Sequence, residues 1–166
     1  MHRSHEFARD MSFLNAARLN SLQKEEFPLL ERRQEMVVAE FEGSVAGKRF
    51  LVLDDEFLIA LDIQQTLESA GAADVLCIAH ADGALKELRN GSAFDCAILD
   101  VKLGDRQQNS LTVANLLTQR GTPFIFLTGM RGEYLHTKEF PAAPVVEKPY
   151  DPDALMAALR KAMAGK

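Results

Sequence analysis

A short apolar segment that ends in three consecutive carboxylates constrains the fold of this chain most strongly. The residues from Phe50 to Leu53 are apolar, and Asp54, Asp55 and Glu56 follow them directly. An apolar run of this length before a helical pattern suits a strand that is buried on both faces of a parallel sheet. Ligands of open α/β sheets bind outside the carboxyl ends of the strands, so the segment predicts a charged site at that edge.

The acidic run has a second explanation, because carboxylates also favour the first turn of a helix through the helix dipole. A helical pattern does begin directly after it, at Phe57. The two explanations are separated by the later strands. Three of these also end in polar side chains, which favours a common site over a purely local effect.

Strand-like and helix-like segments alternate from Lys48 to the end of the chain. This alternation predicts βαβ units and therefore a flavodoxin-like, doubly wound α/β fold, with a five-stranded parallel sheet of order 2-1-3-4-5 and helices on both faces. The region 130–140 is polar and has a weak helical period, so a helix there should be short or absent. The expected strands are 50–53, 75–79, 96–99, 124–127 and 145–146, and the expected helices are 57–70, 82–91, 111–120 and 152 onward.

The expected helices have residues at their ends that typically start and stop helices. Gly71 and Gly91 predict C-terminal stops, since glycine readily adopts the left-handed conformation found there. Asp82, Ser110 and Asp151 are the expected N-caps, because short polar side chains can accept hydrogen bonds from the first turn.

Residues 1–46 differ from the rest, since they show helical periodicity without any strand signal. We expect a helical N-terminal extension and linker at 1–46 and a folded domain at 47–166. The segment from Glu31 to Phe41 has enough apolar positions for an amphipathic helix that needs a partner surface. We expect this helix either to pack on its own domain or to join two chains in a homodimer.

The composition excludes several classes of function. The net charge of −5 and the absence of a basic stripe argue against a nucleic-acid partner. No apolar run approaches the roughly 20 residues of a membrane span. The first residues are not followed by the apolar segment of a secretory signal, so we expect a cytoplasmic protein. Cys77 and Cys96 lie inside apolar runs and lack the spacing of zinc ligands.

The expected sheet order brings the polar strand ends to one edge. Asp54 and Asp55 follow the first strand, Asp100 the third, Thr128 the fourth and Lys148 the fifth. Three carboxylates there suit a Mg²⁺ ion, while a hydroxyl can donate to an anionic oxygen and an ammonium group can neutralise it.

These strand ends resemble the receiver domain of two-component response regulators. The motifs that carry the resemblance are Leu53–Glu56, Ala97–Asp100, Leu127–Gly129 and Glu147–Pro149, and the similarity covers about residues 48 to 164. Their joint spacing is far more specific than any one of them alone.

The resemblance implies a role for each matching residue. Asp100 would be the phosphoacceptor, Thr128 the switch hydroxyl and Lys148 the phosphate-binding lysine. The expected Mg²⁺ ligands are the carboxylates of Asp54, Asp55 and Asp100 and the backbone carbonyl of Lys102. The Lys148–Pro149 peptide bond resembles one that is cis in this family.

One position departs from the usual receiver pattern. Val145 stands where receivers usually carry an aromatic switch residue, three positions before the lysine. Tyr134 or Phe140, from the irregular segment before it, could supply an aromatic ring instead. The run from Pro123 to Gly129, followed by that from Pro144 to Tyr150, is similar to the alphaproteobacterial single-domain receivers nicknamed FAT GUY, although Leu127 and Met130 do not fit that motif.

The function implied is that of a phosphoprotein in phosphorelay signal transduction rather than of an enzyme. It would accept a phosphoryl group from a histidine kinase, or from a histidine phosphotransfer protein, and then modulate a partner or act as a phosphoryl sink. One alternative is the receiver portion of a hybrid histidine kinase. Another is a phosphoaspartate phosphatase, which would need a second aspartate two residues after Asp100, where this chain has Lys102.

Overall fold

The computed structural model of the chain describes residues 45–103, 110–129 and 139–165. Contacts divide the chain into Met1–Glu40 and Phe41–Lys166, and every described residue belongs to the second unit. The predicted N-terminal helix and the loop with Tyr134 lie outside the described residues.

The elements are β1 (Arg49–Leu53), α2 (Phe57–Ser69), β2 (Asp74–Ile78), α3 (Ala81–Arg89), β3 (Cys96–Asp100), α4 (Ser110–Gln119), β4 (Phe124–Thr128), β5 (Val145–Glu147) and α5 (Pro152–Ala164).

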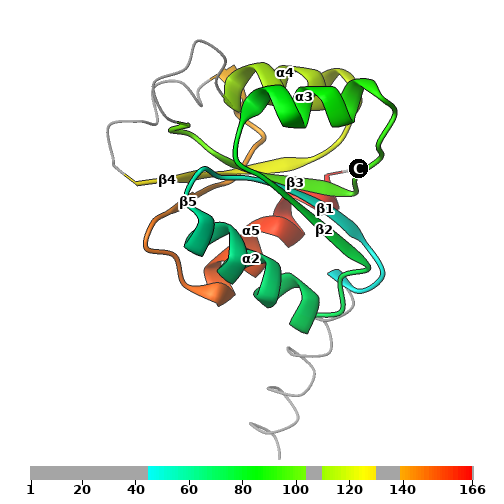
Figure 1. Cartoon of the computed structure of the whole chain (residues 1–166). Helices are drawn as coiled ribbons and strands as arrows, with labels where there is room; N and C mark the ends of the chain where they lie inside the picture. Colours follow the sequence, from blue (N-terminus) through cyan, green and yellow to red (C-terminus); the bar gives the residue numbers. More distant parts are fainter. Residues whose placement is uncertain (1–44, 104–109, 130–138, 166) are drawn as a thin grey trace, which may run out of the picture. The chain divides into compact units, whose positions relative to one another are not determined.

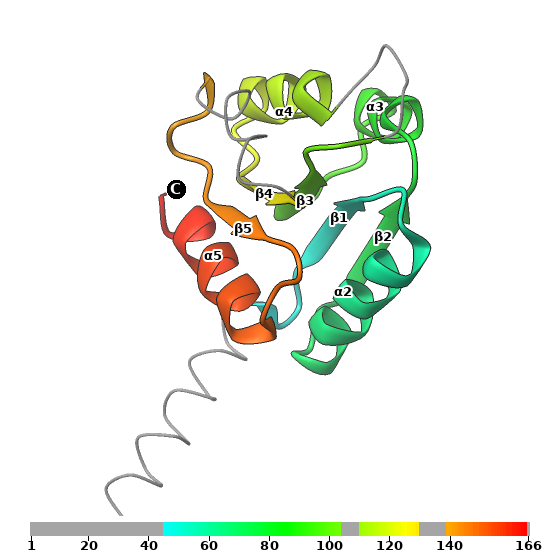
Figure 2. The same cartoon turned by 90° about the vertical axis from the view of Figure 1, so that its left-hand side faces the viewer.

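The five strands form one parallel sheet in the order β2-β1-β3-β4-β5, which confirms the predicted topology. Figures 1 and 2 show α3 and α4 over one face of the sheet and α2 and α5 over the other. Two of the three inner strands, β3 and β4, are buried at every residue. Because helices cover both faces, the strands are continuous apolar runs and do not alternate with polar residues.

Alternate residues of each strand enter two separate cores. On β1, Leu51 and Leu53 belong to the core beneath α3 and α4, whereas Phe50 and Val52 belong to the core beneath α2 and α5. Each fully buried apolar side chain of this size contributes on the order of 1.5–3 kcal/mol. Val45, in the segment predicted as a linker, is fully buried in the second core, so the packed domain begins at or before that residue.

The predicted helix ends are partly correct. Gly71 has a φ of +87°, and the amides of Gly71 and Ala72 donate to the carbonyls of Glu68 and Leu67, so α2 stops as glycine at that position predicts. Asp151 caps α5 by accepting a hydrogen bond of 2.7 Å from the amide of Asp153.

The other two predicted caps are wrong. Asp82 lies inside the first turn of α3, because the helix begins at Ala81 with His80 as its N-cap. Ser110 is already the first residue of α4, and its hydroxyl donates to the carbonyl of Val101, 3.3 Å away.

Two further findings bear on function. The Lys148–Pro149 peptide bond is cis, as the resemblance implied. None of the helices in the described part of the chain combines the length and the apolar character that crossing a bilayer requires.

Candidate functional site

The strand register places the predicted polar residues at one edge of the sheet. Leu53 of β1 pairs with Leu99 of β3, so Asp54 and Asp100 each come one residue after a paired position. On the other side, the amide of Lys148 donates to the carbonyl of Thr128 over 2.7 Å. Neighbouring parallel strands therefore end at the same level, and their last side chains form a common site.

Three aspartates form a compact cluster at this edge. Asp54, Asp55 and Asp100 each offer one carboxylate oxygen, and these oxygens lie within 4.8 Å of one another. Asp54 and Asp100 are only 2% and 3% exposed, whereas Asp55 is exposed. Two buried carboxylates beside a third repel one another unless a cation lies close to them.

Lys148 supplies positive charge to this cluster. Its Nζ lies 2.8 Å from Asp54 Oδ2 and 3.1 Å from Asp100 Oδ2. Backbone amides complete the set, since the N–H of Glu56 donates to Asp54 Oδ1 over 2.9 Å and that of Lys102 to Asp100 Oδ1 over 3.1 Å. The two buried carboxylates are thus held in fixed orientations at the strand ends.

Burial dominates the ionisation of the two buried aspartates, Asp54 and Asp100. It raises the pKa of Asp100 to about 6, although Lys148 and the Lys102 amide oppose the shift. Burial also raises the pKa of Asp54. For Lys148, burial alone would lower the pKa, but the contacts with Asp54 and Asp100 outweigh it and raise the pKa.

The raised pKa of Asp100 predicts that Asp100→Asn stabilises the metal-free protein. An aspartate whose folded pKa exceeds its unfolded value binds more protons when folded, so stability falls as pH rises between the two values. Here the window runs from 3.8 to about 6. In EDTA above pH 6 we expect Asp100→Asn to raise the free energy of unfolding by about 1 to 3 kcal/mol, with little gain below pH 4.

Urea unfolding at pH 7.5 and at pH 4 measures this difference. Asp82→Asn is the matched control, because Asp82 is an exposed carboxylate in the first turn of α3. It should change the free energy of unfolding by about 0.5 kcal/mol or less. If Asp100→Asn were less stable than the wild type at pH 7.5, the ionised carboxylate of Asp100 would stabilise the metal-free protein, which would contradict the prediction.

The site fits a magnesium ion on an observation beyond the acidic cluster itself. Asp54 Oδ2 is buried and accepts no hydrogen bond from any described residue, although it contacts Lys148 Nζ as an ion pair. Buried oxygens are almost always hydrogen-bonded or bound to a cation. Together with the carboxylate oxygens of Asp55 and Asp100, this oxygen forms the donor set that a hard divalent cation prefers.

The structure also locates the remaining predicted residues. Thr128 is fully buried as the last residue of β4. Lys102 lies beside Asp100 through its amide, and the proposed part of its carbonyl in metal binding stays a prediction. Val145 is partly buried and packs against the core beneath α3 and α4.

Two contacts at this edge were not predicted. Glu56 Oε1 accepts a hydrogen bond of 3.1 Å from Lys148 Nζ. The hydroxyl of Tyr150 donates to Asp62 Oδ2 on α2, and burial together with this bond raises the pKa of the tyrosine. Glu56 and Lys148 are 92 positions apart in the sequence, so only the fold brings them together.

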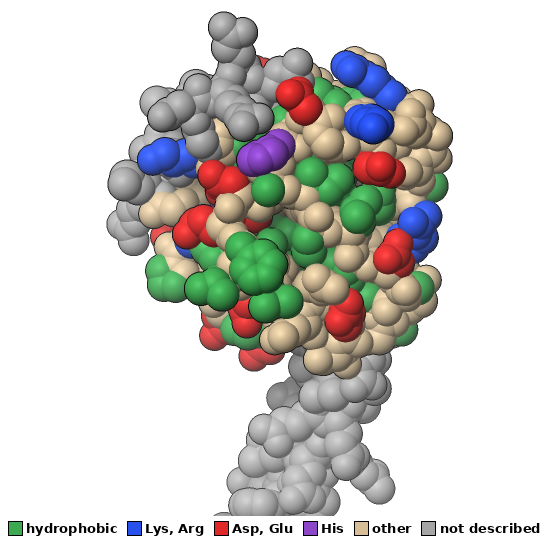
Figure 3. All heavy atoms as spheres, in the orientation of Figure 1, with side chains coloured by type: hydrophobic (Ala, Val, Ile, Leu, Met, Phe, Trp, Pro, Cys, Tyr) green, Lys and Arg blue, Asp and Glu red, His purple; other side chains and the backbone are tan. Residues whose placement is uncertain are grey.

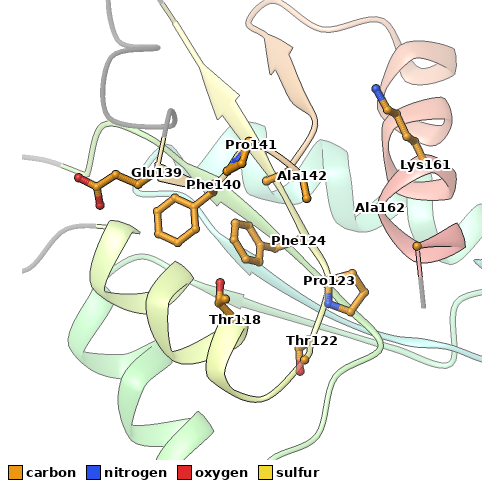
Figure 4. Close-up of a pocket in the computed structure, with 13 residues that line it drawn as sticks. Thr118, Thr122, Pro123, Phe124, Glu139, Phe140, Pro141, Ala142, Lys161 and Ala162 are labelled. Carbon is orange, nitrogen blue, oxygen red and sulfur yellow. The ribbon is translucent and has the colours of Figure 1, made fainter.

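Phe140, one of the two candidates for a replacement aromatic, lies in the core. Its ring centroid is 5.6 Å from that of Phe124 and 5.7 Å from that of Phe126, both on β4. Figure 4 shows Phe140 and Phe124 facing one another in a pocket of about 360 Å³, with Lys161 and Ala162 of α5 on the far side. The pocket lies at the start of β4, whereas Thr128 is the last residue of that strand.

Comparisons with known proteins find similar sequences and structures. The family model of the response regulator receiver domain matches residues 50–160. SdrG from Sphingomonas melonis Fr1 is 31% identical with a TM-score of 0.58, and the match covers 70% of this chain and 97% of that one. A response regulator receiver protein from Sinorhizobium medicae WSM419 is 22% identical with a TM-score of 0.64, covering 71% and 95%.

A longer protein matches over part of its length. The response regulator PhyR from Brucella abortus is 28% identical with a TM-score of 0.58, and the match covers 74% of this chain but 51% of PhyR. This chain therefore spans about half of PhyR. Among curated proteins, no match was found.

Proposed function

Since the chain belongs to the response regulator receiver domain family, we propose that it is a single-domain response regulator that accepts a phosphoryl group on Asp100 from a histidine kinase or a histidine phosphotransfer protein. Its phosphorylated form would modulate a partner protein or act as a phosphoryl sink in the cytoplasm. The match to 97% of SdrG supports the single-domain part of the proposal.

The proposed reaction uses residues at the carboxyl edge of the sheet. A carboxylate oxygen of Asp100 attacks the phosphorus of the donor, the P–N bond to the imidazole breaks, and its electron pair returns to the imidazole nitrogen. Lys148, 3.1 Å from Asp100 Oδ2, neutralises charge on the transferred group. The Thr128 hydroxyl donates a hydrogen bond to a phosphoryl oxygen.

Asp54, Asp55, Asp100 and the Lys102 carbonyl would hold Mg²⁺ next to this reaction. The ion would neutralise the carboxylates and the phosphoryl oxygens. Asp54 and Asp100 are already fixed by the backbone amides of Glu56 and Lys102, so their oxygens need little rearrangement.

One observation carries the proposal, namely the contact between Lys148 Nζ and the buried carboxylate of Asp100 beside two further aspartates. Incubation with acetyl phosphate and Mg²⁺ tests it by intact-mass spectrometry. We expect the mass of one phosphoryl group to be added, and EDTA to prevent the addition. An unchanged mass with Mg²⁺ present would contradict the proposed function.

An exposed apolar pair lies where a protein donor must approach. Phe57 and Leu58, in the first turn of α2, are 74% and 75% exposed, and they are the large apolar side chains most open to solvent in the described part of the chain. Figure 3 shows apolar side chains gathered over the beginning of α2 with acidic side chains beside them. We propose that a helix bearing the phosphohistidine packs on this pair while its imidazole reaches Asp100.

The Leu58→Ser variant is expected to slow phosphoryl transfer from a protein donor without slowing transfer from acetyl phosphate. Loss of one exposed anchor should reduce the second-order rate constant by about tenfold with a histidine phosphotransfer protein that phosphorylates the wild type. Gln65→Ala, on a later turn of α2, is the control. Equal slowing with both donors would place the effect in the site and not in docking.

We also propose that residues 1–46 are a helical extension that pairs two chains, because Glu31–Phe41 has the apolar periodicity of a helix with a partner. Light scattering of the full chain and of a chain without residues 1–43 tests this. We expect the full chain to be a dimer and the shortened chain to be a monomer. The same number of chains per particle in both proteins would contradict pairing.

A further inference from the structure

Glu56 is a partner of Lys148 that the proposed phosphoryl chemistry does not use. We propose that Glu56 occupies the ammonium group of Lys148 in the unphosphorylated protein and competes with the phosphoryl group for it. Glu56 is then a positioning residue that acts through Lys148 and sets how strongly the site binds a phosphoryl group. This inference rests on the proposed function of Asp100 and Lys148.

The three carboxylates around Lys148 differ in their exposure to solvent. Asp54 and Asp100 are buried, and they contact Lys148 Nζ at 2.8 and 3.1 Å. The side chain of Glu56 is 61% exposed and that of Lys148 10%, and Glu56 Oε1 lies 3.1 Å from the same nitrogen. Glu56 therefore reaches the lysine from the solvent side, which is the side from which a phosphodonor must come.

The Glu56 side chain has no other structural task among the described residues. Glu56 is the N-cap of α2, but its carboxylate accepts no hydrogen bond from the first turn of that helix. Its backbone makes the local bonds instead, since its amide donates to Asp54 Oδ1 and its carbonyl accepts from the amides of Ile59 and Ala60. The backbone is thus fixed, and the side chain extends to Lys148.

Competition is expected because Lys148 has a limited number of N–H donors for its anionic partners. A phosphoryl group on Asp100 needs the ammonium group as a donor, and an ammonium group has three N–H bonds. Asp54 and Asp100 are also the buried carboxylates that fit Mg²⁺. Glu56 is the partner without that second role, so it is the one that a phosphoryl oxygen displaces.

Calorimetric titration with beryllofluoride in saturating Mg²⁺ measures this competition, because beryllofluoride mimics a phosphoryl group on an aspartate. Glu56→Gln should bind it about three- to tenfold more tightly than the wild type, the range expected for one charged hydrogen bond of a partly exposed group. Glu68→Gln is the control, because Glu68 is an exposed glutamate at the other end of α2 that pairs with Gln64. It should leave the affinity unchanged.

Glu56→Asp separates contact from net charge. It keeps the negative charge but shortens the side chain by one methylene, so it should bind beryllofluoride as tightly as Glu56→Gln. Wild-type affinity in Glu56→Asp, or unchanged or weaker binding by Glu56→Gln, would overturn the proposal. A wild-type protein that neither binds beryllofluoride nor accepts a phosphoryl group would instead show that the proposed function is wrong.

Discussion

The Asp100→Asn variant is expected to take up no phosphoryl group from acetyl phosphate under conditions in which the wild type takes up one. The amide lacks the anionic oxygen that attacks phosphorus, so we expect the rate to fall by at least about 100-fold. Asp100 is the carboxylate that Lys148 contacts at the end of the central strand β3. Intact-mass spectrometry at matched times measures the difference.

Two controls exclude other causes of that loss. Asp82→Asn makes the same chemical change at an exposed position of α3 and should be phosphorylated like the wild type. In EDTA at neutral pH, Asp100→Asn should also be more stable than the wild type, so its failure to take up a phosphoryl group would not reflect an unstable fold. Undiminished phosphorylation of Asp100→Asn would move the acceptor to another residue.

The Asp55→Ala variant is expected to bind Mg²⁺ at least about tenfold more weakly than the wild type, because it removes one of the three carboxylates that would hold the ion. Asp55 is exposed, so its removal leaves no buried cavity and stability should change little. Calorimetric titration with MgCl₂ measures the affinity.

Asp82→Ala is the control for the magnesium titration, since it removes an exposed carboxylate from α3, outside the acidic cluster. Its affinity for Mg²⁺ should equal that of the wild type. An Asp55→Ala protein with wild-type affinity would show that Asp55 is not a ligand, and the site would then have to be rebuilt around Asp54 and Asp100.

The sheet could be predicted because its central strands are buried on both faces. Segments such as Cys96–Asp100 and Phe124–Thr128 are apolar almost throughout, and parallel strands in this order bring their carboxyl ends together. The common location of Asp54, Asp100 and Lys148 at one edge of the sheet could therefore be predicted from the order of the strands.

Contacts that depend on individual side chains could not be predicted in the same way. The contact of Glu56 with Lys148 spans 92 positions. Glu56 is the N-cap of α2, and its carboxylate contacts Lys148 instead of accepting a hydrogen bond from the first turn of that helix. The bond from Tyr150 to Asp62 spans 88 positions and has no sequence signal.

The error in the predicted N-cap of α3 has a local cause. Asp82 is a good N-cap by residue type, but the chain already turns into the helix at His80, and Ala81 and Ala84 are buried against the sheet. Packing of these two small residues thus begins the helix earlier than the cap preference of Asp82 predicts.

Borohydride reduction of the phosphorylated wild type, followed by peptide mass spectrometry, tests the central claim most directly. Borohydride cleaves an acyl phosphate and converts that aspartate to homoserine, which marks the acceptor in the native sequence. We predict homoserine in place of Asp100 alone, with Asp54 and Asp55 unchanged. Homoserine in place of Asp54 or Asp55, or a phosphorylated protein without any homoserine, would contradict Asp100 as the phosphoacceptor.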